Sequence, residues 1–412
     1  MSSGQITDHS YSFFCYIYSV PAYFYLSFPD FNIWSSPLLV LVLQGLVLIG
    51  LLLFRYIRKR NISDLFLALI LLIVCYEQIC YTVGFMGWYN AFQNTKINYW
   101  LIPMALGLAP MLFFYVKTST SSGFKWKKIY WLHFMPALVL ILYRLSIYTY
   151  DALQPGFGDT QNGYLKIHLD EPIIQPILMI AEFAVMLLYL AFTFQLFVGY
   201  RQKIKLFFSN TYKYELNWIL TFLVIFSVLF IYEAVQDVVG ALITELHYTQ
   251  RWWLNLLLAV ATIFIGVKGY FTDTEKLKNL NFNATSMPSP PADQQDRPVA
   301  SELELNTLRD FMESEKPYLD PELNLNDLAT LANMNRSQLS QLINSGFKKN
   351  FNDFVNEYRI EAVKHQLSEG KHKQLSLLGI AYECGFNSKA TFNRVFKKLT
   401  NTSPTDYLKS IS

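Results

Sequence analysis

The C-terminal end of the chain contains a predicted helix with polar and basic side chains along one face. Phe392, Val395 and Phe396 fall at the helical spacing of a buried face, which leaves the opposite face to five hydrophilic residues. These residues are Lys389, Asn393, Arg394, Lys397 and Lys398. Lysine and arginine neutralise phosphate groups, and arginine and asparagine also form paired hydrogen bonds with base edges. The face is therefore suited to an anionic groove.

A short helix and a tight turn precede this basic helix. Ser376 is a predicted N-cap, and the helix that it begins carries Leu377 and Ile380 among its apolar positions. This helix ends at Gly385, because the tight turn there needs a residue that tolerates positive φ. Residues 375–409 are therefore a predicted helix-turn-helix, an arrangement in which the second helix enters a major groove of DNA.

Residues 323–347 repeat this plan in a weaker form. Asn324 and Asp327 are a predicted N-cap and N3 pair, and Asn333 is suited to the left-handed turn that the glycine makes in the later unit. Residues 336–345 are the predicted second helix of this first unit.

Residues 351–367 are the predicted connection between the two units. Apolar residues recur there at helical spacing, and the segment contains neither Gly nor Pro. The sequence therefore predicts two helix-turn-helix units joined by one continuous helix.

Residues 303–412 resemble the DNA-binding domain of the AraC/XylS family of bacterial transcription regulators. The resemblance rests on the stretches GIAYECGF, TFNRVFKK and TSPTDY, and on the connecting-helix sequence NFNDFVNEYRIEAVKHQL. It implies that the two units enter successive major grooves on one face of the duplex, roughly one helical turn or ~34 Å apart. The chain departs from the family pattern at Lys348 and Asn401, where the family usually has Gly, and at Leu408, where it often has Arg. Asn401 suits a left-handed cap, whereas Lys348 would be sterically strained there, which affects the expected end of the first recognition helix.

Helix position, together with this resemblance, implies which side chains contact double-stranded DNA. The residues expected at base edges are Ser337, Ser340 and Gln341 in the first unit and Lys389, Asn393 and Arg394 in the second. The residues expected at phosphates are Arg336, Lys397 and Lys398. RNA polymerase is a further partner that the resemblance implies.

Charge is polarised along this C-terminal region. Residues 336–412 contain twelve basic and six acidic residues, whereas residues 301–335 contain two basic and eight acidic ones. Phosphate contacts supply most non-specific affinity for DNA, so a basic half beside an acidic half predicts an oriented docking surface. The alternative is that these charges are ordinary solvated helix faces.

The other three quarters of the chain is strongly apolar. Hydrophobic residues make up 52% of the sequence and charged residues only 16%, against about 25% charged residues in a typical soluble protein. Residues 37–54 carry no charge over a length that crosses a ~30 Å hydrocarbon core. The predicted spans are 37–54, 65–86, 97–116, 129–148, 172–199, 216–239 and 252–270. The predicted fold class is all-α, a seven-helix transmembrane bundle followed by a cytoplasmic helical domain with two helix-turn-helix units.

Lysine and arginine gather in alternate connections between these spans, and membrane proteins retain such residues on the cytoplasmic side. The basic connections lie at residues 55–60, 117–128, 201–213 and 268–278, whereas residues 1–36 contain neither Lys nor Arg. We therefore expect a protein of the bacterial cytoplasmic (inner) membrane, with its N-terminus outside and its C-terminal domain in the cytoplasm.

The expected domain organisation has four parts. Residues 1–36 are an extracytoplasmic or interfacial segment, in which residues 11–28 are aromatic and uncharged and are interrupted by Pro21. They are followed by the transmembrane domain (37–271), a flexible linker rich in Pro, Ser and Asn (272–300) and the DNA-binding domain (301–412). The root-mean-square reach of that linker is roughly 30 Å, so the DNA-binding domain should stay close to the membrane.

Four acidic side chains fall inside predicted spans: Glu77, Glu182, Glu233 and Asp237. An ionisable group at that depth is costly, so each is a candidate for sensing an unknown small-molecule or membrane signal, with His133 or Arg144 as potential partners. The alternative is interhelical hydrogen bonding, or a helix end that lies closer to the interface than predicted.

Other classes of protein have less support in the sequence. No zinc-protease, nucleotide-binding or nucleophile-elbow motif occurs, and the four Cys residues are scattered without CxxC spacing, so neither an enzyme, a cofactor nor a metal site is expected. A membrane transporter or receptor with an accessory C-terminal module is the main alternative, but the bundle lacks an evident internal repeat. A C-terminal module that binds protein is a third option, and the basic helix argues against it.

Overall fold

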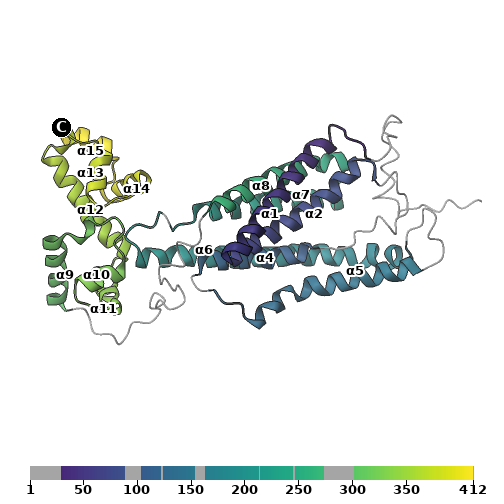
Figure 1. The fold of residues 1–412 in the computed structure, drawn as a ribbon, viewed down its shortest axis with the longest axis horizontal. Helices are drawn as coiled ribbons and strands as arrows, with labels where there is room; N and C mark the ends of the chain where they lie inside the picture. Colours follow the sequence, from purple (N-terminus) through teal and green to yellow (C-terminus); the bar gives the residue numbers. More distant parts are fainter. Residues whose placement is uncertain are drawn as a thin grey trace, which may run out of the picture. The chain divides into compact units, whose positions relative to one another are not determined.

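The computed structural model describes residues 29–88, 104–121, 124–153, 163–212, 214–244, 246–272 and 301–411. Within these residues the chain is almost entirely helical, with an isolated β-bridge between Phe208 and Asn324 (Figure 1). The chain divides into two compact units, which are described separately below. The apolar unit contains Met1–Leu196 and Trp218–Asn281, and the C-terminal unit contains Phe197–Asn217 and Phe282–Ser412. The predicted all-α class is confirmed.

Long apolar helices build the apolar unit. They are α1 (Ser35–Lys59), α2 (Ile62–Phe85), α4 (Ala105–Thr120), α5 (Met135–Leu153), most of α6 (Gln175–Phe207), α7 (Asn217–Leu242) and α8 (Trp252–Phe271). Short helical turns precede α5, α6 and α8, namely η3 (Lys128–Phe134), η4 (Lys166–Ile174) and η5 (Tyr248–Arg251). Leu43, Val47 and Phe54 of α1 are more than half exposed. Apolar side chains on the outer surface are the expected pattern for helices that face lipid.

Each predicted span has a helical counterpart among the described residues. Six helices there are long and apolar enough to cross a membrane, as judged by length and composition. The remaining predicted span, 97–116, corresponds to α4, which has 16 residues, and residues 97–103 lie outside the described part. Residues 11–28 and nearly all of the predicted linker also lie outside it.

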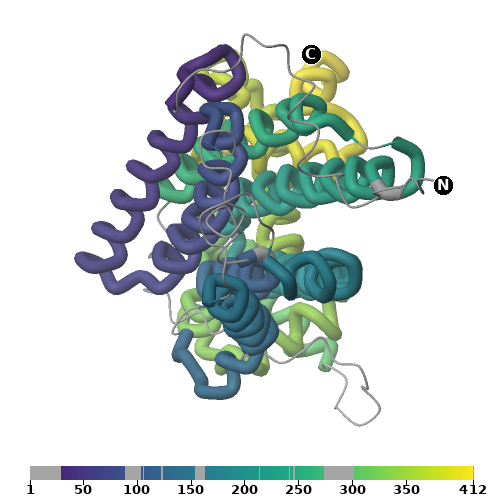
Figure 2. Tube along the Cα trace, turned by 90° about the vertical axis from the view of Figure 1, so that its right-hand side faces the viewer, coloured from purple at the N-terminus to yellow at the C-terminus, as the bar shows by residue number. Residues whose placement is uncertain are grey.

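Helices α1 and α2 run side by side, and α8 packs against both (Figures 1 and 2). Small residues allow the close approach: a Cβ atom at Gly45 would lie 2.6 Å from Cys75 Sγ, and one at Gly269 would lie 2.2 Å from Leu67 Cδ2. At one end of these helices, Arg55 of α1 forms an ion pair with Asp64 of α2 (Nη2–Oδ1 2.6 Å) and donates to the Gly269 carbonyl of α8 (3.0 Å).

Helix α6 extends beyond its predicted span. The sequence predicts an end at residue 199, but the helix continues without interruption to Phe207, through the basic residues Arg201, Lys203 and Lys205. The eight additional residues lengthen the helix by about 12 Å at 1.5 Å per residue. From Phe197 onward, α6 belongs to the C-terminal unit.

Short helices make up the rest of the C-terminal unit. They are α9 (Glu302–Glu315), η7 (Pro317–Leu319), α10 (Leu325–Leu331), α11 (Arg336–Gln341), η8 (Leu342–Gly346), α12 (Phe351–Ser368), η9 (Lys371–Lys373), α13 (Leu377–Glu383), α14 (Lys389–Thr400) and α15 (Pro404–Ile411). Helix α12 packs against η8 on one side of the unit and against α13 and α14 on the other. The predicted connecting helix, 351–367, is therefore confirmed to within one residue.

Candidate nucleic-acid interface

Helices α10 and α11 form the first helix-turn-helix. The Asn324 side chain accepts hydrogen bonds from the backbone N–H groups of Asn326 (2.9 Å) and Asp327 (3.2 Å), and Asp327 completes a capping box. Asn333 has φ 53°, so it makes the predicted left-handed turn. The Asn335 side chain caps α11 by accepting from the Gln338 N–H (2.7 Å). The sequence therefore predicted the start and the turn of this unit correctly.

The first recognition helix ends in a way that the sequence left open. Helix α11 passes directly into the π-helical turn η8, and Lys348 adopts φ 53° just beyond it. A lysine in the left-handed region is strained by roughly 1–2 kcal/mol relative to glycine. Lys348 therefore adopts the left-handed conformation in which the sequence predicts strain.

Helices α13 and α14 form the second helix-turn-helix. The Ser376 side chain accepts from the Gly379 N–H (3.0 Å), and the Ser388 side chain accepts from the Thr391 N–H (3.4 Å) at the start of α14. Gly385 makes the turn at φ 88°, and Asn401 ends α14 in the left-handed region at φ 59°. All of these positions follow the sequence prediction, apart from the Ser388 cap, which was not predicted.

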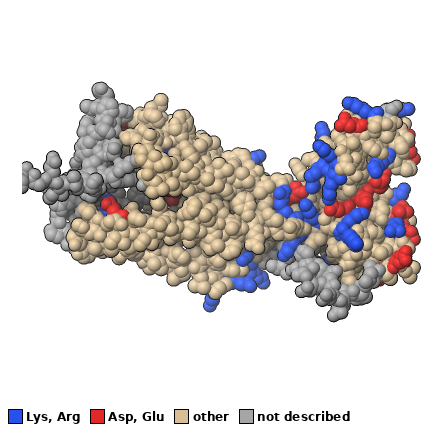
Figure 3. Space-filling view, turned by 180° about the vertical axis from the view of Figure 1, so that it is seen from behind, with Lys and Arg blue, Asp and Glu red and all other residues tan. Residues whose placement is uncertain are grey.

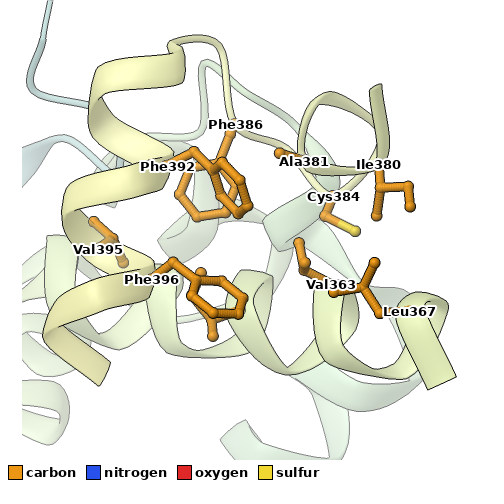
Figure 4. Close-up of a cluster of buried hydrophobic side chains, with 10 residues drawn as sticks. Val363, Leu367, Ile380, Ala381, Cys384, Phe386, Phe392, Val395 and Phe396 are labelled. Carbon is orange, nitrogen blue, oxygen red and sulfur yellow. The ribbon is translucent and has the colours of Figure 1, made fainter. Parts of the chain in front are cut away.

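A buried cluster fixes α14 against α13 and α12. The aromatic rings of Phe386, Phe392 and Phe396 meet side chains of α13 and α12, including Ile380 and Val363 (Figure 4). Burying a side chain of this size contributes on the order of 1.5–3 kcal/mol. Because Phe392, Val395 and Phe396 occupy one side of α14, its hydrophilic side chains are left on the other.

The residues predicted to contact DNA lie on or near the surface. On α14, the five hydrophilic side chains are exposed: Lys389, Asn393, Arg394, Lys397 and Lys398. On α11, Ser337 is exposed, whereas Arg336, Ser340 and Gln341 are half-buried. Figure 3 shows Lys and Arg side chains gathered on the C-terminal unit, among acidic side chains, whereas the drawn face of the apolar unit has few charged side chains.

Two of these side chains already have acidic neighbours. Lys398 Nζ lies 2.8 Å from Asp353 Oδ1 of α12, and Arg394 Nη2 lies 3.6 Å from Glu215 Oε1. Glu215 is in the segment between α6 and α7, which belongs to the C-terminal unit. No local sequence pattern connects Glu215 with Arg394, because the two residues are far apart in the chain.

Arg359 does not belong to the basic docking surface predicted from the charges of residues 336–412. Its side chain is completely buried. Its Nε donates to the Tyr318 carbonyl (2.8 Å) and its Nη2 to the Asp320 carbonyl (2.7 Å). Burial lowers the pKa of Arg359 to about 10, partly offset by Asp320 and Glu322, so the group is still charged at neutral pH. Arg359 therefore holds the domain together and does not face a nucleic acid.

The predicted carboxylates of the apolar unit have different surroundings. Glu77 and Glu182 are half-buried, and Glu233 is exposed on this unit. Asp237 forms an ion pair with Arg251 of η5 (Oδ1–Nη1 2.8 Å) and not with His133 or Arg144. His133 Nδ1 contacts the Tyr189 hydroxyl (2.7 Å), and Arg144 pairs with Asp170. Among the described residues, no group of three or more His, Cys, Asp or Glu side chains lies close enough together to hold a metal ion.

Comparison with known proteins places the C-terminal region in a family. Residues 328–410 match the family model described as a helix-turn-helix domain. An HTH-type transcriptional regulator of Haemophilus influenzae is 33% identical over 88 residues, which are 21% of this chain and 28% of that protein. A regulator of Pseudoalteromonas carrageenovora is 32% identical over 91 residues (22% and 52%), and one of Staphylococcus aureus is 28% identical over 109 residues (26% and 14%).

The chain thus covers about half or less of the length of these three relatives. No solved structure matches it. The resemblance to AraC/XylS regulators is nevertheless confirmed for the C-terminal region, because the family model matches there and the three relatives are HTH-type transcriptional regulators. Residues 328–410 form a helix-turn-helix domain of the type found in transcription regulators.

Proposed function

We propose that this chain is a membrane-embedded bacterial transcription regulator whose two helix-turn-helix units bind specific DNA sequences. One observation carries the proposal: a domain with an exposed basic recognition helix, α14, is part of the same chain as helices whose outer surfaces are apolar. The first property suits DNA, and the second suits a lipid bilayer. A regulator of this kind acts on promoters from the membrane and has RNA polymerase as a further partner.

The base and phosphate contacts follow from the two recognition helices. Ser337, Ser340 and Gln341 lie at i, i+3 and i+4 on α11, and Lys389, Asn393 and Arg394 lie at i, i+4 and i+5 on α14. Ser337, Ser340 and Gln341 share one helix face, as do Lys389 and Asn393, and Arg394 lies next to Asn393 around the helix. Each set is proposed to meet the base edges of one major groove. Arg336, Lys397 and Lys398 are proposed to bind the flanking phosphates.

The test is selection of DNA by the full-length protein. The protein would be reconstituted in lipid nanodiscs and exposed to random-sequence duplexes, and the bound duplexes would be sequenced after several rounds. We expect a motif of two half-sites whose centres lie about 10–10.5 base pairs apart, one helical turn. A pool that remains random after selection would contradict the proposal.

The proposed orientation places the N-terminus outside and the C-terminal unit in the cytoplasm. Reporter fusions after Arg60, Lys127, Lys205 and Lys278 should have cytoplasmic activity, whereas a fusion at Thr249 should report the outside. A cytoplasmic signal at Thr249, or an external one at Lys278, would be incompatible with a DNA-binding domain in the cytoplasm.

We further propose that the apolar unit senses a signal through carboxylates such as Glu182 of α6. Glu182→Gln should then change the expression of target genes while membrane abundance stays normal, and Glu171→Gln in η4 is the matched control. If instead Glu182→Gln altered solute or proton flux in vesicles and left transcripts unchanged, the chain would be a transporter.

A further inference from the structure

The segment between α6 and α7 packs closely onto the DNA-binding domain within the C-terminal unit. We name residues 208–212 and 214–215 the docking segment. Ser209 and Thr211 are completely buried in it, and Asn210 is 6% exposed. Three consecutive polar residues with so little exposure require specific partners, since a buried polar group without a hydrogen bond costs about 1–3 kcal/mol.

The first contact is an anchor on helix α12. The Ser209 carbonyl accepts hydrogen bonds from Asn352 Nδ2 (2.7 Å), Asn356 Nδ2 (3.2 Å) and Arg359 Nη1 (3.5 Å). These donors lie at i, i+4 and i+7, so they converge from one face of the helix. The Ser209 hydroxyl donates to the Leu323 carbonyl (2.6 Å) and accepts from Arg359 Nη2 (3.0 Å).

The anchor is specific because it satisfies buried donors. Asn352, Asn356 and Arg359 are each at most 4% exposed. Ser209 supplies the carbonyl toward which all three converge, and removing it would leave buried amide and guanidinium donors short of acceptors. The domain therefore has a built binding site for this part of its own chain.

The second contact reaches the second helix-turn-helix. Asn210 Nδ2 donates to Oδ1 of Asn387, which lies in the turn just before α14. Glu215 Oε1 lies 3.6 Å from Arg394 Nη2 on α14. The docking segment thus touches both the turn that precedes the recognition helix and the exposed arginine of that helix.

Glu215 is held in place by neighbours on both sides. Thr211 Oγ1 donates to Glu215 Oε1 (2.7 Å), and Asn217 Nδ2 donates to Oε2 (3.2 Å). Arg201 of α6 lies 3.4 Å from Oε2. Burial alone would raise the pKa of Glu215, but these hydrogen bonds and the charges of Arg394 and Arg201 hold it below its usual range. The carboxylate is therefore negatively charged at neutral pH.

We infer that the docking segment and DNA are alternative occupants of the N-terminal half of α14. The docked arrangement is then the DNA-free state of the regulator. The Glu215 carboxylate beside Arg394 repels phosphates, and its ion pair with Arg394 competes with the hydrogen bonds that this arginine would donate to a base edge. DNA must therefore displace the segment. This inference rests on the proposed function, because it requires α14 to be a DNA-reading helix.

Helix α6 could couple the apolar unit to the DNA-binding surface through the docking segment. Helix α6 is continuous from Gln175 to Phe207 and leads directly into the docking segment. Arg201 of α6 contacts Glu215, and Glu215 contacts Arg394. A signal that moves the end of α6 would alter how tightly the segment is docked, and DNA binding would in turn favour the undocked state, since coupling between two sites is reciprocal.

A charge-neutralising pair of variants tests the competition. Glu215→Gln and Glu383→Gln each remove one negative charge. Glu383 is the control, because it lies at the end of α13 and pairs with Lys371 (Oε2–Nζ 3.7 Å) and not with the recognition helix. In full-length protein in nanodiscs, with the duplex recovered by selection, Glu215→Gln should bind about two- to fivefold more tightly than Glu383→Gln. The difference should shrink as salt is raised. Equal affinities, or weaker binding by Glu215→Gln, would overturn the inference.

Cysteine labelling provides a second, independent readout. Thr211→Cys introduces a thiol at a completely buried position, and Tyr212→Cys introduces one at a neighbouring position that is 50% exposed. Saturating duplex should accelerate maleimide labelling at position 211 and leave position 212 unchanged. Protection of position 211 in the DNA complex would mean that segment and DNA bind together, against the inference. If wild-type protein bound no duplex at all, the proposed function itself would fail.

Discussion

The two helix-turn-helix units use different chemistry on the same framework. The first recognition helix, α11, has six residues before it becomes a π turn, and its outward side chains are neutral apart from Arg336. The second, α14, has twelve residues and exposes Lys389, Arg394, Lys397 and Lys398. The second unit should therefore supply most of the salt-dependent affinity, while the first contributes neutral hydrogen bonds.

The turns of the two units also differ, in how closely other parts of the domain pack around them. Asn333 makes the turn of the first unit at φ 53°, which asparagine tolerates. Gly385 makes the turn of the second at φ 88°, and a Cβ atom there would lie 2.3 Å from the Tyr318 carbonyl oxygen and 2.9 Å from Arg359 Nε. The second turn is therefore packed into the centre of the domain, and the first is not.

Substituting the central glycine should have the largest effect. Gly385→Ala combines backbone strain of about 1–3 kcal/mol with an overlap of about 1–3 kcal/mol, so it should destabilise the domain by roughly 2–6 kcal/mol. Gly370→Ala is the control, because φ is 76° there but nothing lies within 4 Å of the added atom. It should cost only the backbone strain, roughly 1–2 kcal/mol.

Cys384 provides the measurement for this pair. Its thiol is completely buried, and burial raises its pKa to about 11, so it reacts only when the domain opens. Mass spectrometry of the peptide that contains Cys384 would follow alkylation in full-length protein. Similar labelling rates for the two variants would show that the second turn is no more crowded than an ordinary glycine turn.

Removing a base contact should have the next largest effect, and a larger one in the second unit. Arg394→Ala should weaken binding to the selected duplex by about 1–3 kcal/mol and relax the preference at one base pair. Ser340→Ala should cost less and leave the salt dependence unchanged, because serine contributes no charge. Titrations of both variants at two salt concentrations would test this. A larger loss for Ser340→Ala would reverse the proposed division of labour.

Local signals explain why much of this domain was predictable from its sequence. Asn324 and Ser376 cap their helices as expected, because capping depends on residues three positions apart. Helix α12 follows from apolar spacing without Gly or Pro, and Gly385 from the turn that it must make. These features are decided by residues that are neighbours in the chain.

Long-range contacts explain what the sequence did not reveal. Ser209 and its partner Asn352 are 143 residues apart, and no local pattern marks a single serine in a short connection. A signal was nevertheless present on α12, where Asn352, Asn356 and Arg359 align on one face of a helix otherwise explained by apolar packing. Polar residues at i, i+4 and i+7 indicate a buried polar contact, and Arg359 was instead counted as a surface charge.

Loss of a helix cap should have a moderate effect that differs between the units. Asn324→Ala removes hydrogen bonds to two backbone N–H groups and breaks a capping box, whereas Ser376→Ala removes one such bond. Each substitution should lower the free energy of unfolding by about 0.5–2 kcal/mol, and the loss should be larger for Asn324→Ala. Alkylation of Cys384 cannot resolve the first unit alone, so hydrogen exchange of α10 and α13 amides is the measurement. Equal protection losses would mean that the box adds nothing.

Loss of a phosphate contact should have the smallest effect and no sequence preference. Lys397→Ala should weaken binding to selected and random duplexes alike, by up to about fivefold at 0.15 M salt, and lower the salt slope by about one. Lys364→Ala is the control, because Lys364 lies on α12 and pairs with Glu361 at 2.8 Å, outside both recognition helices. Its salt slope should match that of the wild type. If Lys397→Ala changed the preferred sequence and left the slope intact, Lys397 would read a base and the phosphate role would pass to its neighbours on α14.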